Sequence, residues 1–247
     1  MKKYIAIYLP VLLIAAILVA CHADVTPPTT SSTYQFQAML VKMTLPDSAA
    51  FFMTLEKDGA PYKGASVRLA GIVIDTSQYG YVKYFLGEQF AADTSYTLNI
   101  KDDSIDVDLT LTLPGDFAIN SPGIRNFTGS AEPVSWTVST QSDGYILATL
   151  PPDTTIYYDA YEAYVGTTQG SIPPEAFLDG DNRIVGNHMI YVAAYNGAPI
   201  DFYELPFIIP ELNNPADNYS GSNISGRLAG MVIAAPDSVI VLEAAAR

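Results

Sequence analysis

Cysteine and histidine are almost absent from this chain of 247 residues, which contains one cysteine and two histidines. A single cysteine cannot form an intramolecular disulfide, so the core must be stable without such a cross-link. His22 and His188 cannot supply a multi-histidine zinc site, and no Gly-x-Ser-x-Gly nucleophile motif is present. We therefore expect no metal, no cofactor and no catalytic residues. We interpret His188 as a strand-end histidine that bonds to the backbone.

Basic residues are also scarce, with 12 Lys and Arg against 26 Asp and Glu and a formal net charge of -14. Nucleic-acid binding depends on Lys and Arg that replace the counterions of the phosphates, and here the basic residues are scattered singly. We expect no nucleic-acid partner. The acidity is interpreted as a means of keeping the chain soluble.

Long apolar runs are missing after residue 20, so we expect no later segment to cross a bilayer, whose core needs about twenty apolar residues. Residues 1–20 differ from the rest. Lys2 and Lys3 precede an apolar stretch, which is the layout of a secretory signal. An uncleaved transmembrane helix is the alternative, although Pro10 interrupts the run near its start.

Leu18-Val-Ala-Cys21 ends this stretch and resembles the lipobox of bacterial lipoproteins. The resemblance implies that residues 1–20 are removed as a signal peptide and that Cys21 is acylated, which makes membrane lipid (palmitate) a partner. Two or more acyl chains would anchor the protein stably. His22, and not Asp, follows the cysteine, and in such lipoproteins this implies sorting to the outer membrane. A plain cleaved signal peptide remains the other reading.

The remainder has a β composition, rich in Tyr, Thr, Ser, Val and Ile and punctuated by Gly and Pro. Residues 21–33 lack packing side chains and predict a flexible tether. Short strand-like runs then alternate with turns, as in a β-sandwich. The predicted strands are residues 36–44, 51–56, 65–69, 72–74, 79–86, 96–100 and 105–113.

Two family resemblances divide this body. Ala60-Pro-Tyr-Lys-Gly-Ala-Ser-Val-Arg-Leu69, after a turn at Lys57-Asp-Gly59, looks like the early hairpin of immunoglobulin-like and carboxypeptidase-regulatory-like domains. Pro133-Val-Ser-Trp136, Asp143-Gly-Tyr145 and the segment 186–197 resemble the second, third and sixth strands of a fibronectin type III domain. His188 stands where that family has its corner tyrosine. We therefore predict an all-β protein with an immunoglobulin-like sandwich at 34–114 and a fibronectin type III-like sandwich with extra C-terminal strands at 115–247.

Two segments are nearly the same: Arg227-Leu-Ala-Gly-Met-Val-Ile233 matches Arg68-Leu-Ala-Gly-Ile-Val-Ile74. One interpretation is a repeated edge-strand hairpin, represented by residues 67–74 and 226–233. A chance match of common apolar residues is the other. The final run, 239–242, predicts a closing strand.

The acidic run from Asp102 to Asp108 contains oxygen ligands of the kind that Ca²⁺ prefers. Apolar residues at 105, 107, 109, 111 and 113 alternate with Asp106, Asp108, Thr110 and Thr112, however, which favours a strand with one buried and one solvated face. Asp179-Gly-Asp181-Asn182 is typical of a tight turn. We predict no metal site in either segment.

Four tyrosines, Tyr157, Tyr158, Tyr161 and Tyr164, form the aromatic cluster of the body. Exposed tyrosines can stack on sugar rings or anchor a protein interface, whereas ordinary cross-strand packing is the alternative. Strict alternation would place Tyr158 with Tyr164 on one face of a strand and Tyr157 with Tyr161 on the other. These residues are the sequence's candidate binding surface.

These observations together predict a membrane-anchored, non-catalytic lipoprotein of the cell envelope. Its function would be binding or adhesion to an envelope protein or a glycan. The alternatives are a structural or assembly component of an envelope complex and, more remotely, a polysaccharide-acting enzyme that uses paired carboxylates.

Overall fold

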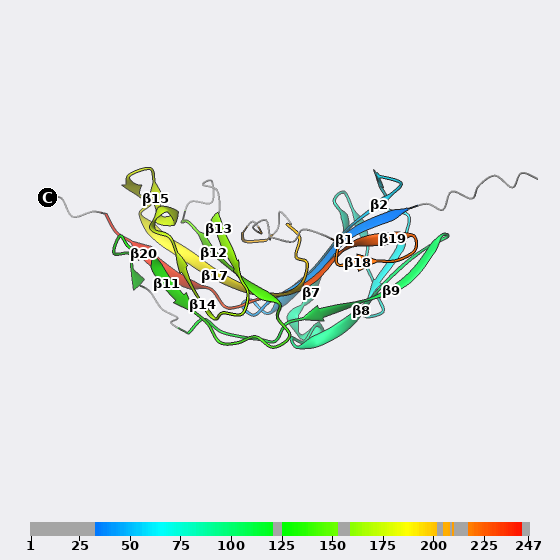
Figure 1. The fold of residues 1–247 in the computed structure, drawn as a ribbon, viewed down its shortest axis with the longest axis horizontal. Helices are drawn as coiled ribbons and strands as arrows, with labels where there is room; N and C mark the ends of the chain where they lie inside the picture. The colour runs from blue at the N-terminus through cyan, green and yellow to red at the C-terminus, as the bar shows by residue number, and fades with distance from the viewer. Residues whose placement is uncertain are drawn as a thin grey trace, which may run out of the picture. The chain divides into compact units, whose positions relative to one another are not determined.

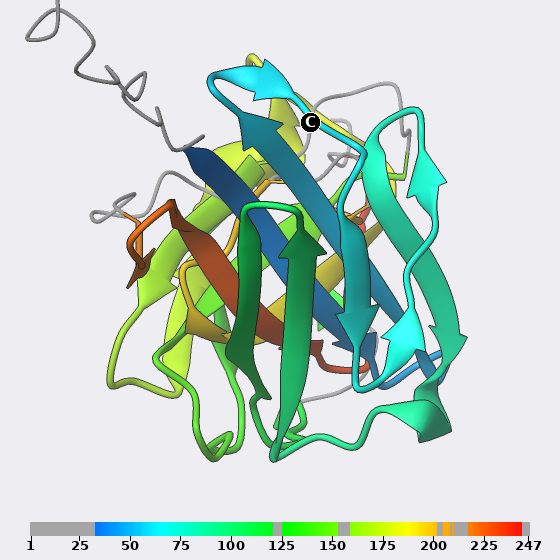
Figure 2. The same ribbon diagram turned by 90° about the vertical axis from the view of Figure 1, so that its right-hand side faces the viewer.

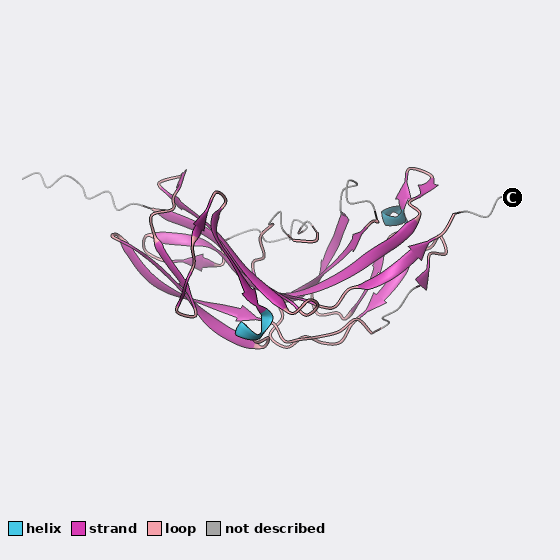
Figure 3. Ribbon diagram, turned by 180° about the vertical axis from the view of Figure 1, so that it is seen from behind, coloured by secondary structure: helices cyan, strands magenta, loops and turns pink. Residues whose placement is uncertain are grey.

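The computed structural model describes residues 33–120, 125–152, 159–201, 205–207, 209 and 217–243. These residues form β-strands and two short 3-10 helices, Gly87–Gln89 and Pro174–Phe177, with no α-helix in this part of the chain (Figure 3). The prediction of an all-β protein is confirmed. Residues 32–247 cluster as one compact unit.

Within the described ranges, twelve strands form one large sheet with the order β10-β20-β17-β19-β1-β2-β7-β6, to which β12, β13, β18 and β3 are added at its sides. Its strands are β1 (Tyr34–Met43), β2 (Ser48–Lys57), β3 (Ala60–Pro61), β6 (Thr76–Ser77), β7 (Gly80–Leu86), β10 (Arg125–Asn126), β12 (Gly144–Leu150), β13 (Asp159–Tyr164), β17 (Gly186–Gly197), β18 (Tyr219–Ser220), β19 (Ile224–Ile233) and β20 (Asp237–Val241). Three smaller sheets, one of four strands and two of two strands, complete the described part.

The pairing of β1 with β19 joins segments that are far apart in the chain. The two strands run parallel over ten residue pairs, from Tyr34 opposite Ile224 to Met43 opposite Ile233. On its other edge, β19 pairs with β17 in an antiparallel sense. Figure 1 shows β1 and β19 lying side by side. The hydrogen-bonded sheet therefore crosses the boundary predicted at residues 114 and 115, and the two predicted segments share one sheet.

A small four-stranded sheet covers the part of the large sheet that contains β1 and β2. It consists of β4 (Ser66–Leu69), β5 (Ile72–Val73), β8 (Thr94–Asp102) and β9 (Ile105–Leu113). Figure 2 shows the β8–β9 hairpin in front of the strands of the large sheet. Val67, Leu98 and Leu111 of this sheet belong to the same buried cluster as Phe36 and Phe51 of the large one. The apolar faces of the two sheets thus form a sandwich core.

A second cover lies over the C-terminal part of the large sheet. It is the pair β11 (Glu132–Ser135) and β14 (Gln169–Ile172). Trp136, directly after β11, is 1% exposed, and its ring lies 5.3 Å from that of buried Tyr145 in β12. Strands are confirmed in the segments predicted at residues 133–136, at Tyr145 and at residues 186–197.

The middle of the large sheet is buried on both faces. Phe36 and Leu40 of β1 belong to the cluster beneath the small sheet, whereas Met39 and Val41 pack on the opposite face with Met231 of β19. Residues 228–234 are all buried. A strand covered on both sides reads as a continuous apolar run, which explains why β19 lacks the alternation seen in β9.

Of the two interpretations of the Arg-Leu-Ala-Gly segments, the repeated edge-strand hairpin does not hold for the second segment. In the first segment Ala70 and Gly71 have φ values of 49° and 79° and turn the chain from β4 into β5. The second segment is continuous strand within β19. Because β19 pairs with other strands on both edges, the same sequence stays extended there and does not form a turn.

Candidate functional site

The predicted lipidation site and half of the tyrosine cluster lie outside the described residues. This applies to Cys21, Tyr157 and Tyr158. Tyr161 and Tyr164 lie in β13, where their Cα atoms are opposite Leu147 and Tyr145 of β12. The register shifts between Ile146 and Leu147. This shift interrupts the backbone pairing of β12 with β13. The grouping of the four tyrosine side chains into two faces stays a prediction.

The acidic run forms the β8–β9 hairpin, and its predicted alternation is confirmed. Asp106, Asp108 and Thr110 are exposed, whereas Leu109 and Leu111 are buried. Lys101 forms an ion pair with Asp106, and the amide of Asn99 donates to Asp108 at 2.9 Å. Among the described residues no three His, Cys, Asp or Glu side chains gather in a group that could hold a metal ion.

The segment from Asp179 to Asn182 forms the predicted tight turn. Its ends pair as β15 (Leu178–Asp179) and β16 (Asn182–Arg183), and Gly180 adopts a φ of 60°. A left-handed backbone at this position favours glycine, so the Asp-Gly-Asp-Asn sequence is explained by the turn of this hairpin.

His188 bonds to the backbone, as predicted. Its side chain is fully buried, and Nε2 lies 2.8 Å from the carbonyl oxygen of Ile184, so Nε2–H is the donor. The ring also packs edge-on against Phe177 at 5.2 Å. Burial lowers the pKa of His188. A neutral, buried imidazole held in this way belongs to the core of β17.

A cluster around Asp102 ties the tip of the β8–β9 hairpin to β1 and β2. Tyr34 donates its hydroxyl to Asp102 at 2.5 Å, and Lys57 donates to the same oxygen at 3.0 Å. The Lys57 ammonium also lies 4.9 Å from the ring centre of Tyr62. The hydrogen bond from Tyr34, followed by that from Lys57, holds the pKa of Asp102 well below its ordinary range. Every charged group in this cluster has a partner, which gives it a structural role.

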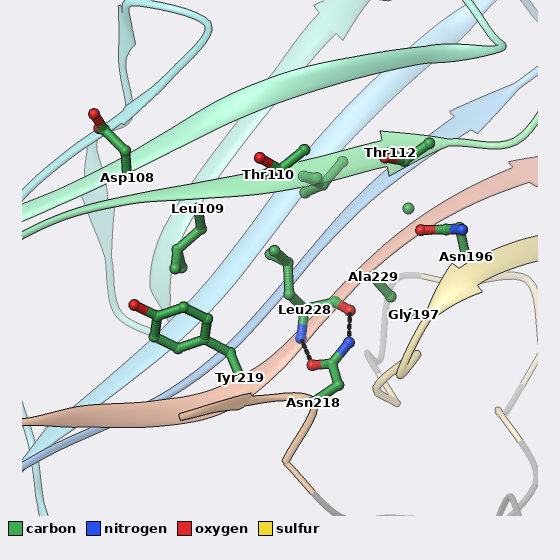
Figure 4. Close-up of a pocket in the computed structure, with 12 residues that line it drawn as sticks. Asp108, Leu109, Thr110, Thr112, Asn196, Gly197, Asn218, Tyr219, Leu228 and Ala229 are labelled. Carbon is green, nitrogen blue, oxygen red and sulfur yellow. Dashed lines mark hydrogen bonds between the residues drawn. The ribbon is translucent and has the colours of Figure 1, made fainter. Parts of the chain in front are cut away.

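A groove of about 290 Å³ lies where β9 faces the β18–β19 part of the large sheet (Figure 4). We call it the β9 groove. One wall is residues 108–112 of β9, and the opposite wall is Asn218 and Tyr219. Gly197 and residues 228–230 of β19 also line it, with Asn196 at one end.

Two glycines let the surrounding strands approach closely enough to shape the β9 groove. A Cβ atom on Gly230 would lie 2.0 Å from the carbonyl oxygen of Thr112, and one on Gly197 would lie 2.2 Å from that of Leu228. No side chain fits at either position without moving backbone. The groove is therefore bounded by main chain at these two points.

Hydrogen bonds hold the polar walls of the β9 groove in place. The Asn218 amide both donates to the carbonyl of Leu228 and accepts from its N–H, each at 2.8 Å, as a paired strand residue would (Figure 4). The Asn196 amide donates to the carbonyl of Gln141 at 2.9 Å. The Tyr219 ring packs against Phe36 with ring centres 6.0 Å apart. The groove thus combines an aromatic ring and an amide on a fixed frame, and the exposed side chains of Asp108 and Thr110 lie along its β9 wall.

Sequence reasoning missed this site, because its walls come from four separate stretches of chain. The alternation predicts only a solvated face for Asp108 and Thr110, and Asn218 and Tyr219 lie in a polar stretch in which the sequence predicts no strand. The local signal was Gly230, a glycine within a buried strand, which indicates a close approach of another backbone.

A small apolar pocket of about 150 Å³ lies elsewhere, at the edge formed by β7. Phe52, Tyr84 and Leu205 line it, among others. Tyr84 is 60% exposed and its neighbour Leu86 is 68% exposed. These two side chains form an apolar surface beside the pocket.

No family model and no curated protein matches this chain. Among solved structures it is similar to a chimeric titin Z1Z2 functionalized with a KLER exogenous peptide from decorin, at 12% identity and a TM-score of 0.25, covering 87% of this chain and 100% of that one. It is also similar to an I-band fragment of titin, at 8% identity and a TM-score of 0.23, covering 85% of this chain and 65% of that one. These are distant similarities to titin immunoglobulin-like domains.

A membrane-spanning helix is not found among the described residues.

Proposed function

We propose that this chain is an exported, non-catalytic binding or adhesion module of the cell envelope, anchored to the outer membrane through acylated Cys21. The anchor is supported by Lys2 and Lys3, the apolar stretch that follows them, and the lipobox-like Leu18-Val-Ala-Cys21. Acylation with two or more chains would give stable attachment without a spanning helix.

The proposal includes the finer division of the fold. Residues 34–114 and 115–247 are proposed to be two immunoglobulin-like sandwiches, the second of them fibronectin type III-like, that share the large sheet. Each segment contributes its own cover, β4-β5-β8-β9 in the first and β11-β14 in the second. The Trp136–Tyr145 packing and the long β17 support the fibronectin-like assignment.

The β9 groove is the observation that supports a binding function. It combines an aromatic ring, Tyr219, with polar groups at Asp108, Thr110 and Asn196. Binding sites characteristically pair apolar contact with a few oriented polar groups on a rigid frame. The ligand proposed for this groove is a segment of an envelope protein or a glycan.

A paired substitution tests the β9 groove as the binding site. Thr110→Arg places a long, charged side chain on the β9 wall of the groove, whereas Thr97→Arg places the same change on the residue opposite Thr110, outside the groove lining. The full chain carrying either change is measured against a glycan array and a peptide library. We expect Thr110→Arg to weaken binding by at least about tenfold, as loss of a central contact does. Equal binding by the two variants would rule the groove out.

The anchor has its own test. Cys21→Ser should abolish labelling by palmitate and release the protein from the membrane fraction of the cells that express it. If both labelling and fractionation stay unchanged, the chain is not a lipoprotein.

An assembly component is the second candidate function, and the exposed Tyr84–Leu86 surface favours it. Exposed apolar patches beside a pocket mark protein contacts. Leu86→Asp should then remove the cross-linked species that contain this protein in intact cells. Val73→Asp, at a residue that is 44% exposed in the small sheet, is the matched control. Unchanged cross-linking in the Leu86 variant would contradict the assembly role.

A further inference from the structure

Strand β9 is an edge strand within the described part of the protein. It pairs with β8 along its whole length and with no other described strand. An edge strand presents a row of backbone N–H and C=O groups that can pair with another chain. The β9 groove runs along this edge.

The register of the hairpin shows which residues face outward. Asp102 and Ile105 flank the two-residue turn, so they form a hydrogen-bonded pair, and such pairs then recur at every second position. The backbone groups of Asp106, Asp108 and Thr110 therefore point away from β8. Thr97, opposite Thr110, agrees with this assignment, because its carbonyl accepts from Ala70 at 2.8 Å on the far side of β8.

Only part of this edge is open. At the end of β9 nearest Thr112, the backbone of Gly230 lies against the Thr112 carbonyl and covers it. Towards Asp106 the edge is not covered by any described strand. Between them, the buried side chain of Leu109 faces Tyr219 and Leu228 across the groove (Figure 4).

We propose that the β9 groove binds an extended peptide segment of a partner protein, which pairs with the outward backbone of residues 106–110 as an added strand. This inference rests on the proposed binding function and names the ligand class for it. Strand addition of this kind supplies affinity through main-chain hydrogen bonds and specificity through alternate side chains.

The groove also indicates the composition of that segment. Alternate side chains of an added strand would point inward onto Leu109 and Tyr219, which favours apolar residues there. The remaining side chains would lie beside Asp106 and Asp108. Asp108 forms no ion pair with any described residue, and the whole chain carries a net charge of -14. A segment that alternates apolar and basic residues fits. A second copy of this chain would instead place acidic residues against Asp108.

A seven-residue probe peptide, with lysine at the odd positions and valine at the even ones, tests the inference by titration against the full chain. The lysines would lie on the same face as Asp106 and Asp108. In an antiparallel addition, directly opposed residues exchange hydrogen bonds, so the lysine N–H groups would face β9. In a parallel addition, the hydrogen bonds come from the residues on either side, so the valine N–H groups would face β9. N-methylation of one set should weaken binding by at least about tenfold, and of the other set by much less. Equal loss with both peptides would show that backbone pairing is not involved and would overturn the inference. Replacing the lysines by glutamates should also abolish binding.

A substitution in the protein gives an independent check. Thr110→Pro removes the outward N–H of Thr110 without removing a bond to β8, because proline is tolerated where the N–H faces outward on an edge. Thr110→Ala keeps that N–H and is the matched control. We expect peptide binding to fall at least about tenfold in the proline variant only. If the proline variant fails to fold, the N-methylated peptides decide the question.

The outcomes separate this inference from the proposed function. Retention of a glycan that Thr110→Arg abolishes, with no peptide binding, would overturn the strand addition and leave the binding module intact. A dimer that Thr110→Pro dissociates would replace the partner segment by a second copy. If Thr110→Arg alters the binding of no probe, the groove is not a binding site and both proposals fail.

Discussion

Residues 68–74 and 227–233 carry nearly the same seven letters and adopt different structures. In the first segment Ala70 and Gly71 both have positive φ and turn the chain between β4 and β5. In the second, Ala229 and Gly230 are extended within β19, which pairs with β1 along its full length. The surroundings of the two glycines also differ. A Cβ atom added to Gly71 would meet open space, whereas one added to Gly230 would meet the backbone of β9.

The difference shows what decides between a turn and a strand. The first segment lies in a small sheet and pairs with β8 on one side, so the chain is free to reverse. The second is buried on both faces and bonded on both edges, so a reversal would leave many buried backbone groups without partners. Pairing with strands that are distant in the sequence, and not the local sequence, therefore decides the conformation of Leu-Ala-Gly.

Gly230→Ala should break the second segment and have the largest effect. The new Cβ would lie 2.0 Å from the Thr112 carbonyl, so β9 or β19 must shift. We expect a loss of about 3 kcal/mol in the free energy of unfolding, or roughly 6–12 °C in melting temperature. Thermal denaturation followed by circular dichroism measures it. A change below about 1 kcal/mol would mean that the two sheets do not approach as described.

Asp102→Asn tests whether the charged cluster around Asp102, in addition to apolar packing, holds the small sheet that contains the first segment against β1 and β2. Loss of charge-assisted hydrogen bonds from Tyr34 and Lys57 should cost about 2 kcal/mol at neutral pH. The pKa of Asp102 is depressed in the fold, so its contribution is present above the unfolded value near 4 and is lost as pH falls through the folded value. The difference between wild type and variant in urea denaturation should therefore shrink below about pH 4. A difference that is independent of pH would exclude the charged cluster as its origin.

Gly71→Ala is the counterpart of Gly230→Ala at the turn, and its effect should be smaller. No atom lies within 4 Å of the Cβ position, so the cost is only that of a left-handed backbone for alanine, about 1 kcal/mol. Both variants are measured in the same denaturation experiment. The ratio of their losses in free energy of unfolding shows how differently the two segments depend on their glycines. If Gly71→Ala proves as costly as Gly230→Ala, close approach of β9 is not what distinguishes the glycines.

Ala70→Asn should have the smallest effect and the opposite sign. Asn-Gly is the preferred pair for a two-residue hairpin in which both residues have positive φ, as Ala70 and Gly71 do. We expect a gain of about 0.5 kcal/mol in the same denaturation assay. Ala229→Asn, which buries an amide in β19, should destabilise the protein instead. A loss of stability in the Ala70 variant would argue against this turn.

Strands with one exposed face could be read from the sequence with good accuracy. The alternation at 105–113 predicted β9 with the same bounds that the structure shows, and the strand predicted at residues 186–197 coincides with β17. The turn at Asp58 and Gly59 is also found, with φ values of 54° and 77°. Each of these signals is local, because periodicity and turn residues act within a few positions.

The β9 groove could not be predicted in the same way. Its walls, Asp108, Asn196 and Tyr219, meet only because β19 pairs with both β1 and β17. The predicted tyrosine surface at Tyr157, Tyr158, Tyr161 and Tyr164 remains a prediction, and Tyr157 and Tyr158 lie outside the described residues. Pairing over such distances in the chain depends on the whole fold.

By itself, the sequence determined that this is an all-β chain whose 247 residues cannot form an intramolecular disulfide. It also specified where several strands begin and end, since alternation and turn chemistry are local. The tertiary structure alone decided that N-terminal and C-terminal segments share one sheet and that one Leu-Ala-Gly turns while its counterpart stays extended. It also decided that β9, an edge strand in the described part of the chain, borders a groove. Those outcomes depend on which surfaces and backbone groups find partners, and many of these partners lie more than a hundred residues away.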